Sequence, residues 1–146
     1  MKEATEMFGG EFRHGIDTKN RIFIPAKMRE ELGETFVVAK DIREKCIKVY
    51  SLLGWEEYLA PIREQNRKLK EKVLRYLNST MVQVSPDSQG RITLPKDLVD
   101  HASIEKGAVV VGCCDYAEIW AEEVYDRMKA EENLPMLLAE LESLGL

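Results

Sequence analysis

A nine-residue motif occurs twice in this 146-residue chain, and its two copies begin 70 positions apart. The copies read DTKNRIFIP at residues 17–25 and DSQGRITLP at residues 87–95. Both fit the pattern Asp, three variable residues, Arg, Ile, one variable residue, an apolar residue and Pro. At the same offset, Val49-Tyr50 matches Ile119-Trp120 and Trp55 matches Tyr125. The repeat therefore indicates that one supersecondary unit has been duplicated.

Each motif predicts a tight hairpin turn, a short strand and a short helix. Asp17 and Asp87 can accept a backbone N–H within the turn, and Gly90 supplies the positive φ that such a loop needs. Asn20 takes the glycine position in the first copy and is the next most tolerant residue. Each unit is predicted as β-β-α-β-β, because a proline ends the second strand and favours a helix start. The expected strands are 7–16, 21–24, 35–40, 46–50, 80–85, 91–94, 108–113 and 117–120, with short helices at 25–32 and 95–101.

The remaining segments predict helices that flank the two units. Residues 55–76 carry apolar positions at the helical period, and Pro61 suggests that the regular helix begins near Ala60. Shorter helical patterns cover residues 122–132 and the tail, 134–144. The tail is acidic and rich in leucine, so we expect it to dock on its own core or a neighbouring subunit rather than on a membrane. The predicted organisation is a first unit at 7–54, a linking helix at 55–79, a second unit at 80–121 and a C-terminal helix and tail at 122–146.

Charge is unevenly placed along this chain of net charge −5. Residues 1–80 carry 16 Lys and Arg against 13 Asp and Glu, whereas residues 81–146 carry 5 against 13. Only the first half is therefore a candidate face for a polyanion. The acidic start of the chain and the lack of a long apolar run predict a cytoplasmic protein with no signal peptide and no membrane partner.

No residue pattern for catalysis or for a cofactor is visible. The three cysteines, Cys46, Cys113 and Cys114, lack ligand spacing with each other or with the histidines, so we expect reduced thiols and no metal. Nor is there a nucleophile–base pair, a phosphate-binding glycine loop or an obvious carboxylate pair. We therefore expect a protein that is not an enzyme and has no cofactor and no small-molecule substrate.

With the doubled Asp-x-x-x-Arg motif at this spacing, the chain resembles the MraZ family from about Phe8 to Asn133. This family is a bacterial relative of the AbrB, SpoVT and MazE swapped-hairpin transcription factors. The resemblance implies an α+β fold in which two AbrB-like units form a pseudo-twofold β-barrel with flanking helices. It also implies a ring-shaped homo-oligomer, associated with the nucleoid, that controls transcription. The DNA it implies is a set of short G-rich direct repeats upstream of the division and cell-wall gene cluster.

Arg21 is the strongest candidate for reading a base, because its planar fork can bond guanine O6 and N7 together. Arg13, His14 and Lys19 are suited to phosphate contacts beside it. The second motif has no basic residue before Arg91, so for Arg91 DNA contact and simple bracing of the turn by Asp87 stay equally open. Bracing is also the expected main role of both motif aspartates. The predicted DNA-binding set is Arg13, His14, Lys19, Asn20, Arg21 and Arg91, with Asp17, Asp87 and Gly90 shaping the turns.

A sequence-specific DNA-binding regulator is thus the leading functional prediction. The alternative is an antitoxin-like, protein-binding module on the same scaffold. It ranks lower because antitoxins usually keep one unit and a disordered tail, whereas this chain has two units and a helical tail pattern.

Overall fold

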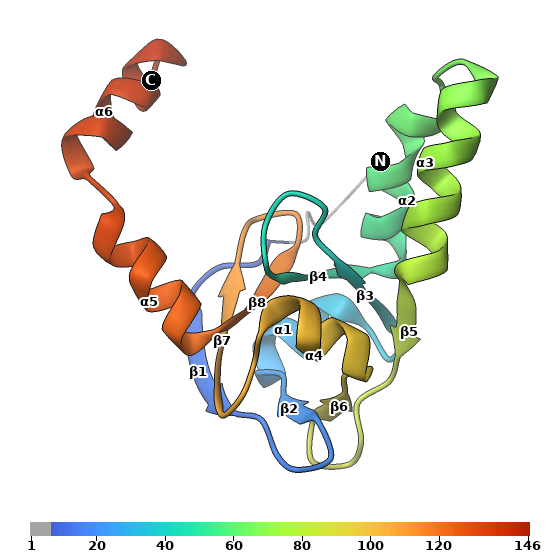
Figure 1. Cartoon of the computed structure of the whole chain (residues 1–146), viewed down its shortest axis with the longest axis vertical. Coiled ribbons are helices and arrows are strands. Elements are labelled where there is room, and N and C mark those ends of the chain that lie inside the picture. Colours follow the sequence, from blue (N-terminus) through green and yellow to red (C-terminus); the bar gives the residue numbers. More distant parts are fainter. Residues whose placement is uncertain (1–6) are drawn as a thin grey trace.

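The computed structural model describes residues 7–146, and the first six residues, which bear on the expected absence of a signal peptide, lie outside that range. The described chain forms eight strands and six helices (Figure 1). In order these are β1 (Glu11–Gly15), β2 (Arg21–Phe23), α1 (Ala26–Leu32), β3 (Phe36–Lys40), β4 (Ile47–Ser51), α2 (Leu52–Arg63), α3 (Arg67–Thr80), β5 (Val82–Val84), β6 (Arg91–Thr93), α4 (Lys96–Ala102), β7 (Gly107–Gly112), β8 (Ala117–Ala121), α5 (Glu122–Glu131) and α6 (Leu134–Ser143).

The strands on either side of each motif turn pair with strands of the other unit, whereas β3 with β4 and β7 with β8 pair within their own units. A six-stranded antiparallel sheet has the order β1-β7-β8-β4-β3-β5, and β2 pairs with β6 in a separate two-stranded sheet. The first strand of each unit thus lies against the third strand of the other unit, as β1 on β7 and β5 on β3. The prediction that the strands around each Asp-x-x-x-Arg turn form a hairpin with each other was wrong. The physical reason is that two short units complete one another's sheets and so share one core.

The repeated isoleucine of the motif lies at the centre of that core. Ile22 and Ile92 are direct partners in the β2–β6 register, and neither side chain has any exposed surface. Ile24 and Leu94, two positions further on, are 1% exposed. Helices α1 and α4 cover the same core with Met28, Leu32, Leu98 and Val99. Burying two equivalent apolar ladders against each other explains why both motifs keep an apolar residue at every second position.

The fold class is α+β, but a closed barrel is not observed. Strands β1 and β5 stand at the two ends of the six-stranded sheet, so the sheet is open in its hydrogen bonding. Strand β1 is also shorter than predicted, and beyond it the chain adds only a single bridge between Phe8 and Cys114.

The linking segment is two helices instead of the single helix predicted for residues 55–76. Helix α2 begins at Leu52, where the Ser51 side chain accepts a hydrogen bond from the Gly54 N–H, and it continues through Pro61. Helix α3 begins after Asn66, whose side chain accepts from the Leu69 N–H. A new N-cap at Asn66 therefore explains the break that the apolar periodicity did not reveal.

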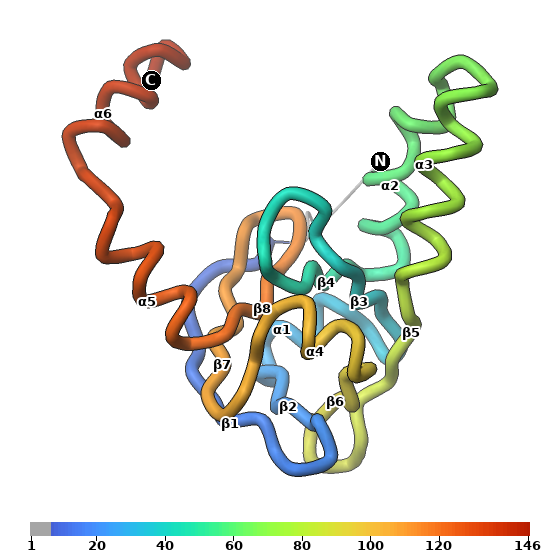
Figure 2. The backbone as a smooth tube through the Cα atoms, in the orientation of Figure 1, coloured from blue at the N-terminus to red at the C-terminus, as the bar shows by residue number. Residues whose placement is uncertain are grey.

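The helices outside the two units form two arms on opposite sides of the strands. Helices α2 and α3 make one arm, and α5 and α6 make the other (Figures 1 and 2). The base of each arm is packed on the sheet: Trp55 contacts Tyr50 at a ring-centroid distance of 5.5 Å, and Trp120 contacts Tyr125 at 6.2 Å. Helix α6 buries no residue, so the tail does not dock on its own core, and docking on a neighbouring subunit stays a prediction. Among residues 7–146 no helix is long and apolar enough to cross a membrane.

Candidate nucleic-acid interface

The two Asp-x-x-x-Arg turns have the same internal hydrogen bonds. Asp17 Oδ1 accepts from the N–H groups of Lys19 and Arg21, at 2.9 and 2.8 Å. In the second turn Asp87 Oδ1 accepts from the N–H of Gln89 at 2.9 Å and of Arg91 at 3.0 Å. Asn20 and Gly90 both take positive φ, 58° and 80°. Each turn is therefore closed by its own aspartate, which fixes where the following arginine leaves the backbone.

The turns also lie side by side, because each one bonds to the strand of the other motif. The Ile24 N–H donates to the Gly90 carbonyl at 3.0 Å, and the Leu94 N–H donates to the Asn20 carbonyl at 2.8 Å. Figure 2 shows the two loops together at the end of the molecule away from the arms. Residues 70 positions apart in sequence are thus brought onto one surface.

Both motif arginines pair with their aspartates in the same way. Arg21 Nε donates to Asp17 Oδ2 at 2.7 Å, and Arg91 Nε donates to Asp87 Oδ2 at 2.9 Å. Within residues 7–146 neither guanidinium has another hydrogen bond, so the terminal Nη groups remain available. The backbone donors of Arg21 and Arg91, with the guanidinium contacts, hold the pKa of both aspartates below its usual range. The bracing interaction expected from the sequence is present in both turns, and it leaves the outer edge of each fork free.

Of the other predicted basic residues, Lys19 lies at the turn, whereas His14 and Arg13 contact other side chains. Lys19 is exposed at the first turn. The His14 ring instead contacts the Phe23 ring at 4.9 Å. Arg13 donates to Asp126 at 2.8 Å and to Glu122 at 3.1 Å, and the Asp126 hydrogen bond is the main cause of its raised pKa. The structure therefore gives Arg13 carboxylate partners on α5, which the sequence reasoning did not foresee.

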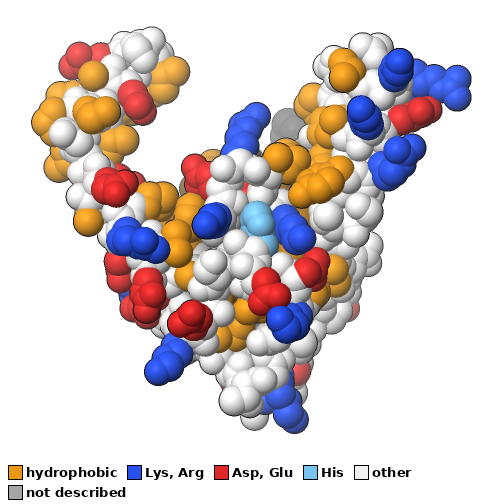
Figure 3. Space-filling model, viewed as in Figure 1, with side chains coloured by type: hydrophobic (Ala, Val, Ile, Leu, Met, Phe, Trp, Pro, Cys, Tyr) orange, Lys and Arg blue, Asp and Glu red, His pale blue; other side chains and the backbone are white. Residues whose placement is uncertain are grey.

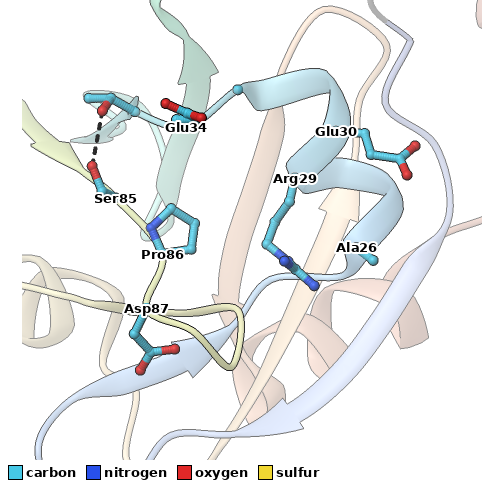
Figure 4. A pocket seen from close by; sticks show the side chains of 9 residues that line it. Ala26, Arg29, Glu30, Glu34, Ser85, Pro86 and Asp87 are labelled. Atoms are coloured by element: carbon cyan, nitrogen blue, oxygen red, sulfur yellow. Dashed lines mark hydrogen bonds between the residues drawn. The ribbon is translucent and has the colours of Figure 1, made fainter.

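A basic residue that the sequence reasoning missed, Arg29 of α1, lies against the second turn. Its Nε donates to the Ile24 carbonyl at 2.9 Å, and its guanidinium lies 5.7 Å from the centre of the Phe23 ring. Its guanidinium lies beside Gly90, and Arg29 lines one side of a hollow of about 740 Å³ that has Pro86 and Asp87 on the other side (Figure 4). The second motif therefore has a basic side chain beside it, although 62 residues separate Arg29 from Arg91 in the sequence. Comparing the two units at the 70-residue offset does not reveal Arg29, because the equivalent position in the second unit is Val99.

Gly90→Ala is expected to destabilise the protein by about 1–2 kcal/mol, since a Cβ is strained at positive φ. The added Cβ would also lie 2.8 Å from Arg29 Cζ and would displace that side chain. Asn20→Gly is the matched control at the other turn, where the same φ sign is already occupied, and it should leave the free energy of unfolding within about 0.5 kcal/mol. Urea denaturation of the two variants makes the comparison, and equal stability of Gly90→Ala and the wild type would contradict it.

One group of potential metal ligands also comes together, contrary to the spacing argument. Single ligand atoms of Asp41, Glu44, Cys46 and Glu118 lie within 4.8 Å of one another. Burial raises the pKa of the Cys46 thiol, which is within reach of Asp41 Oδ2 at 3.5 Å. A thiol must lose its proton to bind a metal, so the burial of Cys46 works against metal binding by this residue.

Two interlocked β-β-α-β-β units that present paired arginine turns define the protein as a two-unit α+β protein with a candidate polyanion-binding surface. The family model described as "MraZ protein, putative antitoxin-like" matches residues 7–75 and 79–140. The chain belongs to the MraZ family.

Similar proteins come from several bacteria. A protein of Alkaliphilus oremlandii is 38% identical over 131 residues, which cover 88% of this chain and 90% of the relative. A protein of Clostridium acetobutylicum is 42% identical over 120 residues, or 80% and 83% of the two chains. One from Clostridium tetani is 35% identical over 144 residues, covering 96% of this chain and all of its own. Each of these relatives bears the name transcriptional regulator MraZ.

Proposed function

We propose that this protein is a transcriptional regulator that binds double-stranded DNA through its two arginine turns. The observation that carries the proposal is that Arg21 and Arg91 lie on adjacent turns, each held at Nε by an aspartate and free at its Nη groups. The names of the relatives support the regulatory role. The proposed setting is the cytoplasm, on the nucleoid, and the proposed target is a set of short G-rich direct repeats upstream of the division and cell-wall gene cluster.

The aspartates orient the arginines for base reading. An arginine recognises guanine with two parallel N–H donors, and this requires the fork to enter the major groove in one orientation. Asp17 accepts from Nε of Arg21 and so turns the Nη edge outward without neutralising the donors that would meet the base. Lys19 at the turn tip supplies a phosphate contact that positions the motif without reading sequence.

The two turns differ least where they are proposed to read DNA. Their aspartates, arginines and closing hydrogen bonds match, and the tips differ as Thr18, Lys19 and Asn20 in one turn against Ser88, Gln89 and Gly90 in the other. We therefore extend the proposed base contact to Arg91. Arg13 and His14 are retained as secondary phosphate contacts, to be made only after Arg13 leaves Glu122 and Asp126.

The exchange of strands supports the finer structural proposal as well. The reciprocal pairs β1–β7 and β3–β5, with β2–β6 between the motifs, support the proposal that two AbrB-like swapped-hairpin units are related by a pseudo-twofold axis, although their six-stranded sheet is open. On this proposal residues 7–54 and 80–121 are the two units, residues 55–79 link them, and residues 122–146 are the C-terminal helices. The assembled form is proposed to be a ring of several copies.

A fluorescence-anisotropy titration tests the function. Labelled duplexes carrying G-rich direct repeats should bind far more tightly than scrambled duplexes of equal length and composition, at the same salt concentration. Equal affinity for the two duplexes would show that the binding is not sequence-specific. Absence of binding to either would favour the antitoxin-like, protein-binding alternative instead.

A further inference from the structure

A third arginine, Arg29 of α1, lies against the second turn with one edge of its guanidinium unbonded. Its Nε donates to the Ile24 carbonyl at 2.9 Å. A Cβ built on Gly90 would lie 3.0 Å from Arg29 Nη2, and Gly90 is buried although it belongs to a turn. Within residues 7–146 the guanidinium has no other hydrogen bond and no ion pair. Arg29 therefore has the arrangement seen in the two motif arginines, a held Nε and free Nη donors.

Arg29 differs from the motif arginines because its charge is not paired. Arg21 and Arg91 each form an ion pair with the aspartate of their own turn, at 2.7 and 2.9 Å. The acceptor for Arg29 is a neutral carbonyl, so its full positive charge remains. In Figure 3 the Lys and Arg side chains on the visible face of the body are interspersed with Asp and Glu, and no broad basic surface is seen there. A single unpaired cation beside a turn is therefore important for attracting a phosphate.

A comparison of the two units indicates what Arg29 replaces. The first turn has Lys19 at its tip, where the second turn has the uncharged Gln89. The position of Arg29 is taken in the second unit by Val99, which is buried. The first turn thus carries a basic residue of its own, whereas the second has one supplied by helix α1.

Gly90 makes room for this side chain. A Cβ at residue 90 would lie 2.8 Å from Arg29 Cζ, which is too close for the guanidinium to keep its place. The first unit has Asn20 at the position of Gly90 and Val99 lies at the equivalent of Arg29 in the second unit. Two differences between the copies are therefore linked in space, because the turn that lacks a Cβ is the turn that receives the arginine.

The carboxylates around the hollow beside Arg29 do not pair with its guanidinium. Glu30, Glu34 and Asp87 line this hollow together with Arg29. Asp87 is engaged by Arg91 and by the backbone of its own turn. Neither glutamate forms an ion pair with Arg29, and Glu30 extends from the other side of α1 (Figure 4). The Nη edge of Arg29 is thus available to an anion that approaches the second turn.

We propose that Arg29 is the phosphate-binding residue of the second turn, and that its Nη groups bind a backbone phosphate of the DNA beside Gly90. This inference rests on the proposed binding of DNA by the two turns. The contact positions the second turn without reading sequence, as Lys19 is proposed to do at the first turn, and it leaves base reading to Arg91.

Two full-length variants remove the contact in different ways, and a third is the matched control. Arg29→Gln removes the charge. Gly90→Asn leaves the net charge unchanged and introduces a residue that tolerates positive φ, but its Cβ displaces the guanidinium of Arg29. Lys27→Gln removes one positive charge from the same helix, at an exposed side chain that lines a different hollow.

Anisotropy titrations with the repeat and scrambled duplexes, at several salt concentrations, measure the contact. Arg29→Gln should reduce the steepness of log affinity against log salt by about 1 for each second turn in contact with DNA, and Gly90→Asn should reduce it in the same direction. Both duplexes should lose affinity by a similar factor, so the preference for the repeats stays within about two-fold of the wild type. Lys27→Gln should keep the wild-type steepness. Adding Gln89→Lys to Arg29→Gln should restore the steepness, because it places a cation at the tip of the same turn.

Wild-type steepness in Arg29→Gln would overturn the inference, and so would an equal reduction in Lys27→Gln, which would indicate an effect of net charge alone. Loss of the repeat preference at unchanged steepness, without rescue by Gln89→Lys, would assign Arg29 to bracing the second turn. Circular dichroism and melting curves identify a variant that does not fold. If Arg29→Gln does not fold, wild-type steepness in Gly90→Asn is the result that overturns the contact.

The wild type separates this inference from the proposed function. A wild type that binds both duplexes equally would refute sequence-specific regulation, yet the scrambled duplex would still measure the phosphate contact of Arg29. A wild type that binds neither duplex would overturn both proposals. A wild type that prefers the repeats, with unchanged steepness in Arg29→Gln, would overturn only the role of Arg29.

Discussion

Arg21→Ala is expected to reduce binding to G-rich repeat DNA by roughly ten-fold or more per occupied turn, because one bidentate contact to guanine contributes about 1–3 kcal/mol of discrimination. The substitution should leave the fold intact. Ile22, next in the chain, carries the core contact, while the Arg21 pair with Asp17 is partly exposed and contributes at most about 1 kcal/mol. Anisotropy titrations and thermal melts of the same preparations measure the two effects.

Arg21→Lys is the sharper control. It keeps the positive charge but loses the planar fork, so binding to scrambled DNA should persist while the preference for the repeats is lost. Arg91→Ala should weaken the preference in the same direction, since the two turns share one geometry. Unchanged specificity in Arg91→Ala would restrict base reading to the first turn, and unchanged specificity in Arg21→Lys would assign Arg21 to the phosphates.

The difference between the two turn tips offers a reciprocal check. Lys19→Gln gives the first tip the residue that the second has at the equivalent position, and it should reduce the steepness of log affinity against log salt by about 1 per turn in contact with DNA. Gln89→Lys should raise the slope by a similar amount if the second turn also reaches the backbone. These changes alter affinity for all sequences equally, so they distinguish a positioning contact from a base contact.

Much of the fold could be predicted from the repeat, because the motif residues themselves favour a particular turn and a particular helix start. The motif residues that close a turn, Asp17 and Asp87, do so in both copies, and the short helices begin within one residue of the predicted start. Strand pairing was not predictable from the motif itself. A turn that closes within five residues is typical of a hairpin, and the motif alone does not show that its flanking strands pair with the other unit.

Contacts in the candidate site could be predicted between residues close in sequence, but not between residues that only the fold brings together. Asp17 with Arg21, four residues apart, could be paired from the sequence. The engagement of Arg13 by Asp126 joins residues 113 positions apart, and the approach of Arg29 to Gly90 depends on how α1 lies against the second turn. Charge counting along the chain therefore overstated the basic surroundings of the first turn and understated those of the second. Neither error affects the arginines themselves, whose geometry comes from their own turns.

Affinity for DNA is expected to depend more on the number and spacing of repeats than on any one repeat. The chain has a net charge of −5, and each copy offers few free basic residues at its turns, so a single copy should bind weakly and lose that binding as salt rises. In the proposed ring, several identical pairs of turns can meet one duplex, and every contact after the first is intramolecular.

Duplexes with one, two and three repeats measure this dependence at fixed salt. Each added repeat should tighten binding by roughly ten-fold or more when successive repeats fall about one helical turn apart. Lengthening one spacer by about half a turn should cancel the gain from the repeat beyond it, because that repeat then faces away from the ring. Equal binding of one and three repeats by the assembled wild type would show that the turns act independently, and that the ring has no part in recognition.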